Sequence, residues 1–171
     1  MELWDLYDEN RKLINKLHNR ENPMVHGEKH IVVDIWTVNS NYEVLLTLRH
    51  PDKKDYPDCW ENTGGSILAG ENSKQGAVRE LFEETGIIAC ENELHLLGTH
   101  KEPTAFVDSY IVRKDIKISE LTMQEGETVG AKWVSLRTLD EMISDGSIAY
   151  PVSRRLKPVR KEFEMFIFAK D

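Results

Sequence analysis

The chain has 171 residues, a length that predicts a single domain with an adequate hydrophobic core. Its formal net charge is −8, from 30 acidic and 22 basic residues. This balance argues against a nucleic-acid backbone as the main partner, because such binding needs a basic surface. No stretch approaches about 18 apolar residues, so the sequence predicts no membrane span.

The N-terminus and the cysteines indicate a compartment. The segment MELWDLYDEN is acidic and lacks the apolar run of a signal peptide. Cys59 and Cys90 form neither a CxxC pair nor a disulfide framework, which is typical of thiols in a reducing environment. We therefore expect a cytoplasmic protein.

The first half of the chain reads mainly as strands. Residues 2–7 are expected to form a short strand, followed by a turn at 8–10 and irregular or helical structure to about Arg20. The runs 30–37 and 44–49 are apolar and β-rich on either side of Asn39-Ser40-Asn41, which predicts a hairpin. Residues 51–57 are expected to form a charged loop.

The second half alternates between the two kinds of element. A helix is expected whose start is capped by Ser73 or Asn72 and which ends at Gly86, where left-handed backbone is common. Strands are expected at 93–99, within 105–116 and at 131–135, an acidic loop at 124–130, and helices at 136–144 and 152–169. Pro158 could kink the last helix or delay its start. Strands interleaved with helices predict an α/β sandwich.

The helix that ends at Gly86 has two contrasting faces. Glu80, Glu83 and Glu84 share one arc through i+3 and i+4 spacing, and Gly76 leaves that arc open. The opposite arc is expected to be buried and carries Ala77, Val78, Leu81, Phe82 and Thr85.

The acidic arc weakens the helix. A like-charge pair at i,i+4 costs about 0.2–0.5 kcal/mol, and an interior glycine costs about 1 kcal/mol relative to alanine. A local cost without a local gain points to function, and clustered carboxylates suit Mg²⁺ or Mn²⁺. A solvated acidic face is the competing interpretation.

The surroundings of the helix decide between these interpretations. Residues 65–87 place Gly65, Glu71, Arg79-Glu80, Glu83-Glu84 and Gly86 at fixed spacing, with apolar residues at 81 and 87. These nine positions resemble the complete signature of the Nudix hydrolases. The resemblance implies a Nudix α/β/α sandwich with a mixed β-sheet between helices. We expect one domain over 1–171, with a core at about 28–170 and an N-terminal extension at 1–27.

The resemblance also implies roles at the site. Glu80, Glu83 and Glu84 would bind Mg²⁺ or Mn²⁺, and Glu83 or a carboxylate outside the signature would deprotonate the attacking water. Arg79 would belong to the catalytic site by pairing with Glu71 and holding the loop against the helix. An ordinary surface ion pair is the alternative for these two residues.

Further residues complete the expected site. Gly64 and Gly65 would let the backbone approach a phosphate, and Gly65 and Gly86 would set loop geometry. Glu127 is a candidate metal ligand because many similar enzymes place a glutamate in this loop, with Glu125 as its competitor.

Other polar and aromatic residues carry weaker signals. The six histidines show no metal-binding spacing and are expected to be non-ligands. Trp60 and Tyr150 could stack on a base, and Arg20 and Arg49 could contact a phosphate. Core packing or solvation is the alternative for each.

The predicted reaction is hydrolysis of a diphosphate bond by metal-assisted attack of water. The resemblance implies a substrate that is a nucleoside diphosphate linked to another moiety, or a nucleoside di- or triphosphate. It also allows a homodimer, since similar proteins often dimerise.

Two alternatives share the fold. The layout resembles isopentenyl-diphosphate isomerase, with His30, Arg49 and Trp60-Glu61-Asn62-Thr63 as shared features. That enzyme needs a cysteine and a histidine where this chain has Gly64 and Ser66, and Cys59 is out of register. A non-catalytic nucleotide-sensing module would be expected to lose the acidic ligands, which this chain keeps.

Overall fold

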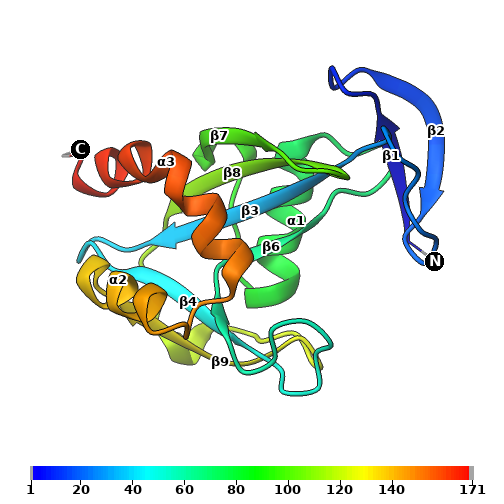
Figure 1. Cartoon of the computed structure of the whole chain (residues 1–171). Coiled ribbons are helices and arrows are strands. Elements are labelled where there is room, and N and C mark those ends of the chain that lie inside the picture. Colours follow the sequence, from blue (N-terminus) through cyan, green and yellow to red (C-terminus); the bar gives the residue numbers. More distant parts are fainter. Residues whose placement is uncertain (1, 170–171) are drawn as a thin grey trace.

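The computed structural model describes residues 2–169 and places one mixed β-sheet between helices (Figure 1). The strands of the main sheet are β3 His30–Val38, β4 Val44–Arg49, β5 Trp60–Glu61, β6 Thr63–Ser66, β7 His95–Lys101, β8 Ala105–Arg113 and β9 Thr128–Val134, and a separate two-stranded sheet contains β1 Leu3–Tyr7 and β2 Leu13–Asn19. The α-helices are α1 Ser73–Thr85, α2 Leu136–Ser144 and α3 Tyr150–Phe168. None of the helices described is long and apolar enough to cross a membrane.

Strand β3 is the centre of the main sheet. It pairs in parallel with β8, from His30 opposite Ala105 to Val38 opposite Arg113. On its other side it pairs antiparallel with β6, and its pairing with β4 is confined to Val38 opposite Val44. The predicted hairpin therefore opens after its turn, which leaves room for β6 beside β3 and for β5 beside β4, while β9 pairs with the other edge of β4.

Two cores cover the two faces of this sheet. Alternate residues of β3 point in opposite directions, so Val33 and Ile35 pack toward α1, whereas Trp36 and Val38 pack toward the opposite face. There they meet side chains from α2 and α3, including Leu139, Leu156 and Phe163. The expected mixed sheet between helices is confirmed.

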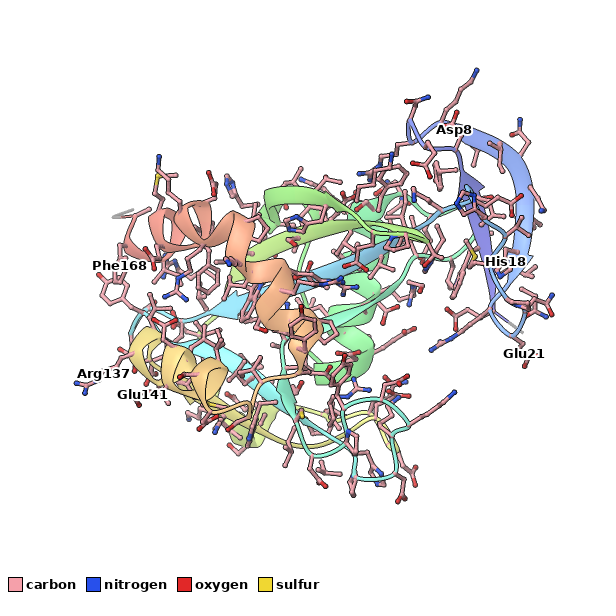
Figure 2. The ribbon with its side chains drawn as sticks, in the orientation of Figure 1. Asp8, His18, Glu21, Arg137, Glu141 and Phe168 are labelled. Atoms are coloured by element: carbon pink, nitrogen blue, oxygen red, sulfur yellow. The ribbon has the colours of Figure 1, made fainter. Side chains whose placement is uncertain are left out.

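The N-terminal segment forms an antiparallel hairpin, not irregular or helical structure after residue 10. Strand β1 is as expected, and β2 pairs with it from Leu3 opposite Asn19 to Tyr7 opposite Leu13. The hairpin extends away from the main sheet (Figures 1 and 2). The prediction of a helix relied on apolar residues at 13, 14 and 17, but all three are exposed.

Several other boundaries differ from the expectation. Strand β9 begins at Thr128, within the expected acidic loop, because it pairs with β4 as far as Arg49. Strand β7 begins at His95, after a 3-10 turn at Glu91–Glu93. Helix α3 begins at Tyr150 and continues through Pro158, so this proline does not delay its start.

Candidate active site

Helix α1 carries the glutamates, and both of its ends are fixed by caps. The Asn72 side chain accepts a hydrogen bond from the Gln75 backbone N–H at 3.0 Å, and the Gln75 side chain accepts one from Asn72 N–H at 2.9 Å. At the other end, Gly86 has φ of 73° and donates its N–H to Phe82 O at 2.8 Å. This reciprocal cap identifies Asn72, and not Ser73, as the N-cap of α1.

The buried face of α1 differs from the expectation at two positions. Ala77, Leu81 and Thr85 are buried as expected, but Phe82 is 55% exposed. Gly76 is also buried, and a Cβ built on it would lie 2.3 Å from Ile67 Cγ2. Gly76 therefore allows α1 to pack closely against Ile67 and does not open the acidic arc.

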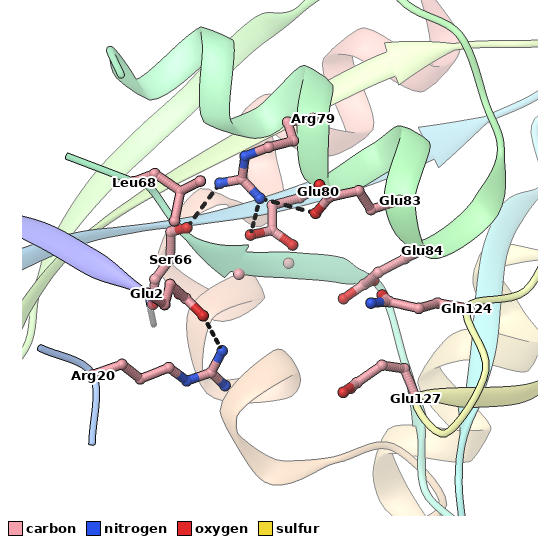
Figure 3. Close-up of a pocket in the computed structure, with 12 residues that line it drawn as sticks. Glu2, Arg20, Ser66, Leu68, Arg79, Glu80, Glu83, Glu84, Gln124 and Glu127 are labelled. Carbon is pink, nitrogen blue, oxygen red and sulfur yellow. Dashed lines mark hydrogen bonds and ion pairs between the residues drawn. The ribbon is translucent and has the colours of Figure 1, made fainter. Parts of the chain in front are cut away.

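A cavity lies beside the acidic face of α1 (Figure 3). Its walls come from α1, from β6, from the start and end of the N-terminal hairpin, and from the loop before β9. Five glutamates and two arginines line it, namely Glu2, Glu80, Glu83, Glu84, Glu127, Arg20 and Arg79.

Arg79 connects the loop before α1 to the glutamates. Its Nε and Nη2 donate to the two carboxylate oxygens of Glu71 at 2.8 and 2.9 Å, and Nη2 also donates to Ser66 O at 3.0 Å. Its Nη1 donates to Glu80 at 2.9 Å and to Glu83 at 3.0 Å. These hydrogen bonds, those from Glu71 foremost, raise the pKa of Arg79, which is a permanent cation.

Glu71 is a paired anion at the base of this network. Burial raises the pKa of Glu71, but hydrogen bonds from Arg79 and from the Leu68 N–H outweigh burial, so its pKa lies below the usual value. Arg79 and Glu71 are thus part of a hydrogen-bond network that also includes Glu80, Glu83 and Ser66, and they are not an isolated surface ion pair.

Glu80 lies directly over Gly65. A Cβ built on Gly65 would lie 2.3 Å from the Glu80 carboxyl carbon, so only glycine leaves this carboxylate its place. Burial raises the pKa of Glu80, and the neighbouring Glu83 and Glu2 act in the same direction. Gly64 and Gly65 belong to strand β6, paired with Asp34 and Val33, and so do not form the expected loop.

Glu84 is a partly buried acid in the wall of the cavity. Its Oε2 is inaccessible to solvent and has no hydrogen-bond partner within residues 2–169. Burial raises the pKa of Glu84 well above its usual value, and the charges of Glu61, Glu80 and Glu127 add to this effect. A buried acid with an unpaired oxygen among like charges is costly unless a cation joins it.

The loop before β9 supplies Gln124 and Glu127 to the cavity, while Glu125 does not line it. Glu127 forms an ion pair with Lys53, from the charged loop after β4. Of the two competing candidates, Glu127 is therefore the one that faces the α1 glutamates (Figure 3).

The carboxylates suit a hard cation in chemistry but are not yet gathered around one point. In residues 2–169 no three His, Cys, Asp or Glu side chains form a ready metal-binding group. Arg79 Nη1 accounts for part of this spacing, because it bonds both Glu80 and Glu83. The oxygen-only ligand set and the unpaired Glu84 oxygen fit Mg²⁺ or Mn²⁺.

The remaining candidates fall in different places. Arg20 lines the cavity, whereas Arg49 forms two hydrogen bonds with Glu61 at 2.9 and 2.7 Å. The Trp60 ring lies under Lys132 Nζ at 3.9 Å. Tyr150 is 63% exposed at the start of α3.

Sequence reasoning missed two acids that act on the site. Glu2 lines the cavity, and the charge of Glu61 raises the pKa of Glu84. Glu61 had a weak signal, as the acidic residue within the segment Trp60-Glu61-Asn62-Thr63. Glu2 had none, since its position depends on how the hairpin meets the sheet.

Together, the sandwich and its glutamate-lined cavity define a class of metal-assisted phosphohydrolases. The model of the NUDIX domain matches residues 28–156, and the chain belongs to the Nudix family. The expected family and enzyme class are thereby confirmed, and the chain is a hydrolase of pyrophosphate bonds.

Individual relatives agree with this assignment. An uncharacterised Nudix hydrolase of Listeria monocytogenes is 35% identical over 147 residues, which cover 85% of this chain and 87% of the relative. The crystal structure of DR0079 from Deinococcus radiodurans shares the fold with a TM-score of 0.75 and 21% identity, over 94% of this chain and 98% of that one.

A further neighbour was crystallised with ligands. A bifunctional NMN adenylyltransferase/ADP ribose pyrophosphatase from Francisella tularensis, complexed with AMP and a Mn ion, has a TM-score of 0.62 and 20% identity. The match covers 83% of this chain and 43% of that one. Divalent metals are general in Nudix hydrolases, and neighbours of this fold bind nucleotide-like molecules.

Proposed function

We propose that this enzyme uses Mg²⁺ or Mn²⁺ to hydrolyse a nucleoside diphosphate linked to another moiety, or a nucleoside di- or triphosphate. The observation that carries the proposal is the Glu84 carboxylate, which lines a cavity with four other glutamates and has one buried oxygen without a hydrogen-bond partner in the described residues. The AMP and Mn ion named for the Francisella neighbour support a nucleotide substrate and a divalent cation.

Glu80, Glu83 and Glu84 would hold the cation from α1, and Glu127 would complete the set from the opposite wall. A cation bound there supplies charge neutralisation for the phosphates and a lower pKa for bound water. Glu80 and Glu84, both buried acids with raised pKa values, would be kept ionised by this partner.

Arg79 and Glu71 would act as positioning residues. Their pair of hydrogen bonds fixes the guanidinium between α1 and the loop that connects β6 to α1, and Arg79 would keep this pair while its hydrogen bonds to Glu80 and Glu83 are released. The orientation of the glutamates would then depend on a contact that never touches the substrate.

Removal of a proton from the attacking water falls to a carboxylate at the mouth of the cavity. Glu83 is the candidate, because its side chain is 46% exposed and is bonded to Arg79 at only one oxygen. Glu127, 40% exposed on the facing wall, is the alternative base outside the signature.

A second hollow would take the group linked to the diphosphate. It shares Gly64, Gly65 and Ser66 with the first cavity, so one strand separates the two. Its other walls include Asn62, Tyr56 and Arg155. A homodimer and a cytoplasmic location stay predictions.

The test is hydrolysis of a nucleotide panel with Mg²⁺ or Mn²⁺. At least one nucleoside diphosphate derivative should be cleaved by the wild type, and Glu84→Gln should lower the rate at least about a hundredfold. Glu125→Gln is the matched control, because it alters an acid of the same loop that does not line the cavity. Equal rates for Glu84→Gln and the wild type, or no cleavage of any panel member, would refute the proposal.

A further inference from the structure

The wall of the cavity that faces α1 is built by the N-terminal segment. Glu2 and Arg20 flank the β1–β2 hairpin and both line the cavity opposite the glutamates of α1 (Figure 3). Both lie outside residues 28–156, the part of the chain that the family model matches. The hairpin thus contributes charged groups to a site whose other parts belong to the Nudix core.

The two arginines of the cavity differ in how many of their N–H donors are free to bind a ligand. Arg79 uses Nε, Nη1 and Nη2 on Glu71, Glu80, Glu83 and the Ser66 carbonyl. Arg20 donates only through Nη1, to Glu2 Oε2 at 2.6 Å, and its Nε and Nη2 have no partner in the described part of the chain. With its side chain 62% exposed, Arg20 has free donors that a ligand can reach.

The position of Arg20 is held by the fold. The Arg20 backbone N–H donates to Glu2 O at 3.1 Å, and Glu2 Oε1 accepts a hydrogen bond from Trp4 Nε1 at 2.9 Å. Trp4 is buried and stacks on His30, with ring centroids 4.0 Å apart. Glu2 is therefore anchored to the core independently of Arg20.

The charges across the cavity favour an anion between the walls once a cation is bound. Hydrogen bonding to Glu2 chiefly raises the pKa of Arg20, and the charges of Glu127 and Glu80 act in the same direction. When a divalent cation neutralises the carboxylates, Arg20 is the positive group on the facing wall. A diphosphate has oxygens on all sides, so a cation on one side leaves others directed at Arg20.

We infer that Arg20 binds the non-bridging phosphate oxygens of the substrate's diphosphate, and that the N-terminal hairpin is thereby part of the substrate-binding site. The inference rests on the proposed function. Arg20 either exchanges its hydrogen bond to Glu2 for hydrogen bonds to the phosphate, or keeps that bond through Nη1 and binds the phosphate through Nε and Nη2. This exchange is feasible because an exposed ion pair contributes little to stability, whereas guanidinium–phosphate bonds are strong and two-pronged.

The test measures binding of methylenediphosphonate, which cannot be hydrolysed, by calorimetry in the presence of Mg²⁺. Arg20→Ala should raise the dissociation constant about tenfold, and Arg20→Lys should recover part of the loss. Lys16→Ala is the matched control, because Lys16 is on the same hairpin and pairs with Glu28 at 2.7 Å but does not line the cavity. This control should bind like the wild type.

Kinetics on a cleaved nucleotide separate binding from a structural role. Arg20→Ala should raise KM about tenfold and change kcat little, since the bond is made in the ground state as well as the transition state. An unchanged dissociation constant and KM in Arg20→Ala would overturn the inference, as would an equal loss in Lys16→Ala. If Arg20→Ala melts earlier than the wild type, the same comparison is made with Arg20→Gln.

The inference and the proposed function can fail separately. Binding of the probe that depends on Arg20, without turnover of any nucleotide, would support the inference and refute the proposed reaction. Turnover by the wild type with identical constants in all Arg20 variants would refute the inference and leave the reaction standing.

Discussion

Gly65 and Glu80 compete for the same space, and this contact allows a test that separates the site from the fold. The three atoms nearest to a methyl group added at Gly65 would all belong to the end of the flexible Glu80 side chain. Gly65→Ala should therefore fold normally while Glu80 leaves its place. Metal-dependent hydrolysis should fall at least about tenfold, with a melting temperature close to that of the wild type.

Gly130→Ala is the control for this substitution. Gly130 lies in β9, and within residues 2–169 its added Cβ would meet only Leu48 Cβ, at 3.8 Å. Its activity should equal that of the wild type. Full activity in Gly65→Ala would show that the position of Glu80 does not matter for the reaction.

His30 makes the stability of the protein depend on pH. Burial lowers the pKa of His30 to about 4, with His18 acting in the same direction and Glu2 and Glu102 opposing it. Its buried Nδ1 has no partner within residues 2–169. Between pH of about 6.5 and 4, His30 is protonated in the unfolded chain but not in the folded one. The free energy of unfolding therefore decreases as the pH is lowered through this window, by up to about 1.4 kcal/mol per pH unit.

Urea unfolding of the wild type and His30→Gln at several pH values checks this dependence. The difference in unfolding free energy between the two proteins should change across this window and be constant above pH of about 7. A difference that is independent of pH would mean that His30 is protonated equally in the folded and unfolded chain.

At the scale of elements, Gly76 sets how closely α1 approaches the segment after β6. An added Cβ would lie 2.3 Å from Ile67 Cγ2 and 3.0 Å from Ile67 Cβ, and Ile67 is 2% exposed. Gly76→Ala should therefore destabilise the protein by about 1–3 kcal/mol in urea unfolding, as overpacking does. At an open helix position the same change would stabilise it by about 1 kcal/mol, and that result would contradict the packing described here.

Elements with strong local signals were predicted well from the sequence. The bounds of α2 agree at both ends, and α1 was recognised from its cap and from Gly86. The prediction of irregular or helical structure where β2 lies was wrong. This strand is stabilised by pairing with β1, and the helix-like spacing of Leu13, Ile14 and Leu17 gives no sign of that pairing. The prediction that Phe82 is buried was wrong, because the core covers Leu81 and Thr85 but does not extend around α1 as far as Phe82.

At the scale of the whole molecule, contacts between site residues close together in the sequence could be predicted, whereas contacts between residues far apart in the sequence could not. Residues 71–86 are local, so one helix and one loop sufficed to bring Arg79 to Glu71. The approach of Glu2 and Arg20 depends on the backbone contacts of β1 with Lys29 and Ala69, and that of Glu127 depends on the β4–β9 ladder. No local pattern encodes these pairings.

The account depends on capture of a divalent cation by the glutamates of α1, and calorimetric titration with Mn²⁺ tests this most directly. The wild type should take up Mn²⁺ saturably, and Glu80→Gln and Glu84→Gln should each weaken uptake at least about tenfold, because each removes a charged oxygen ligand. Glu125→Gln should bind as the wild type does. Absence of Mn²⁺ uptake by the wild type, or equal affinity in the two α1 variants, would contradict the account.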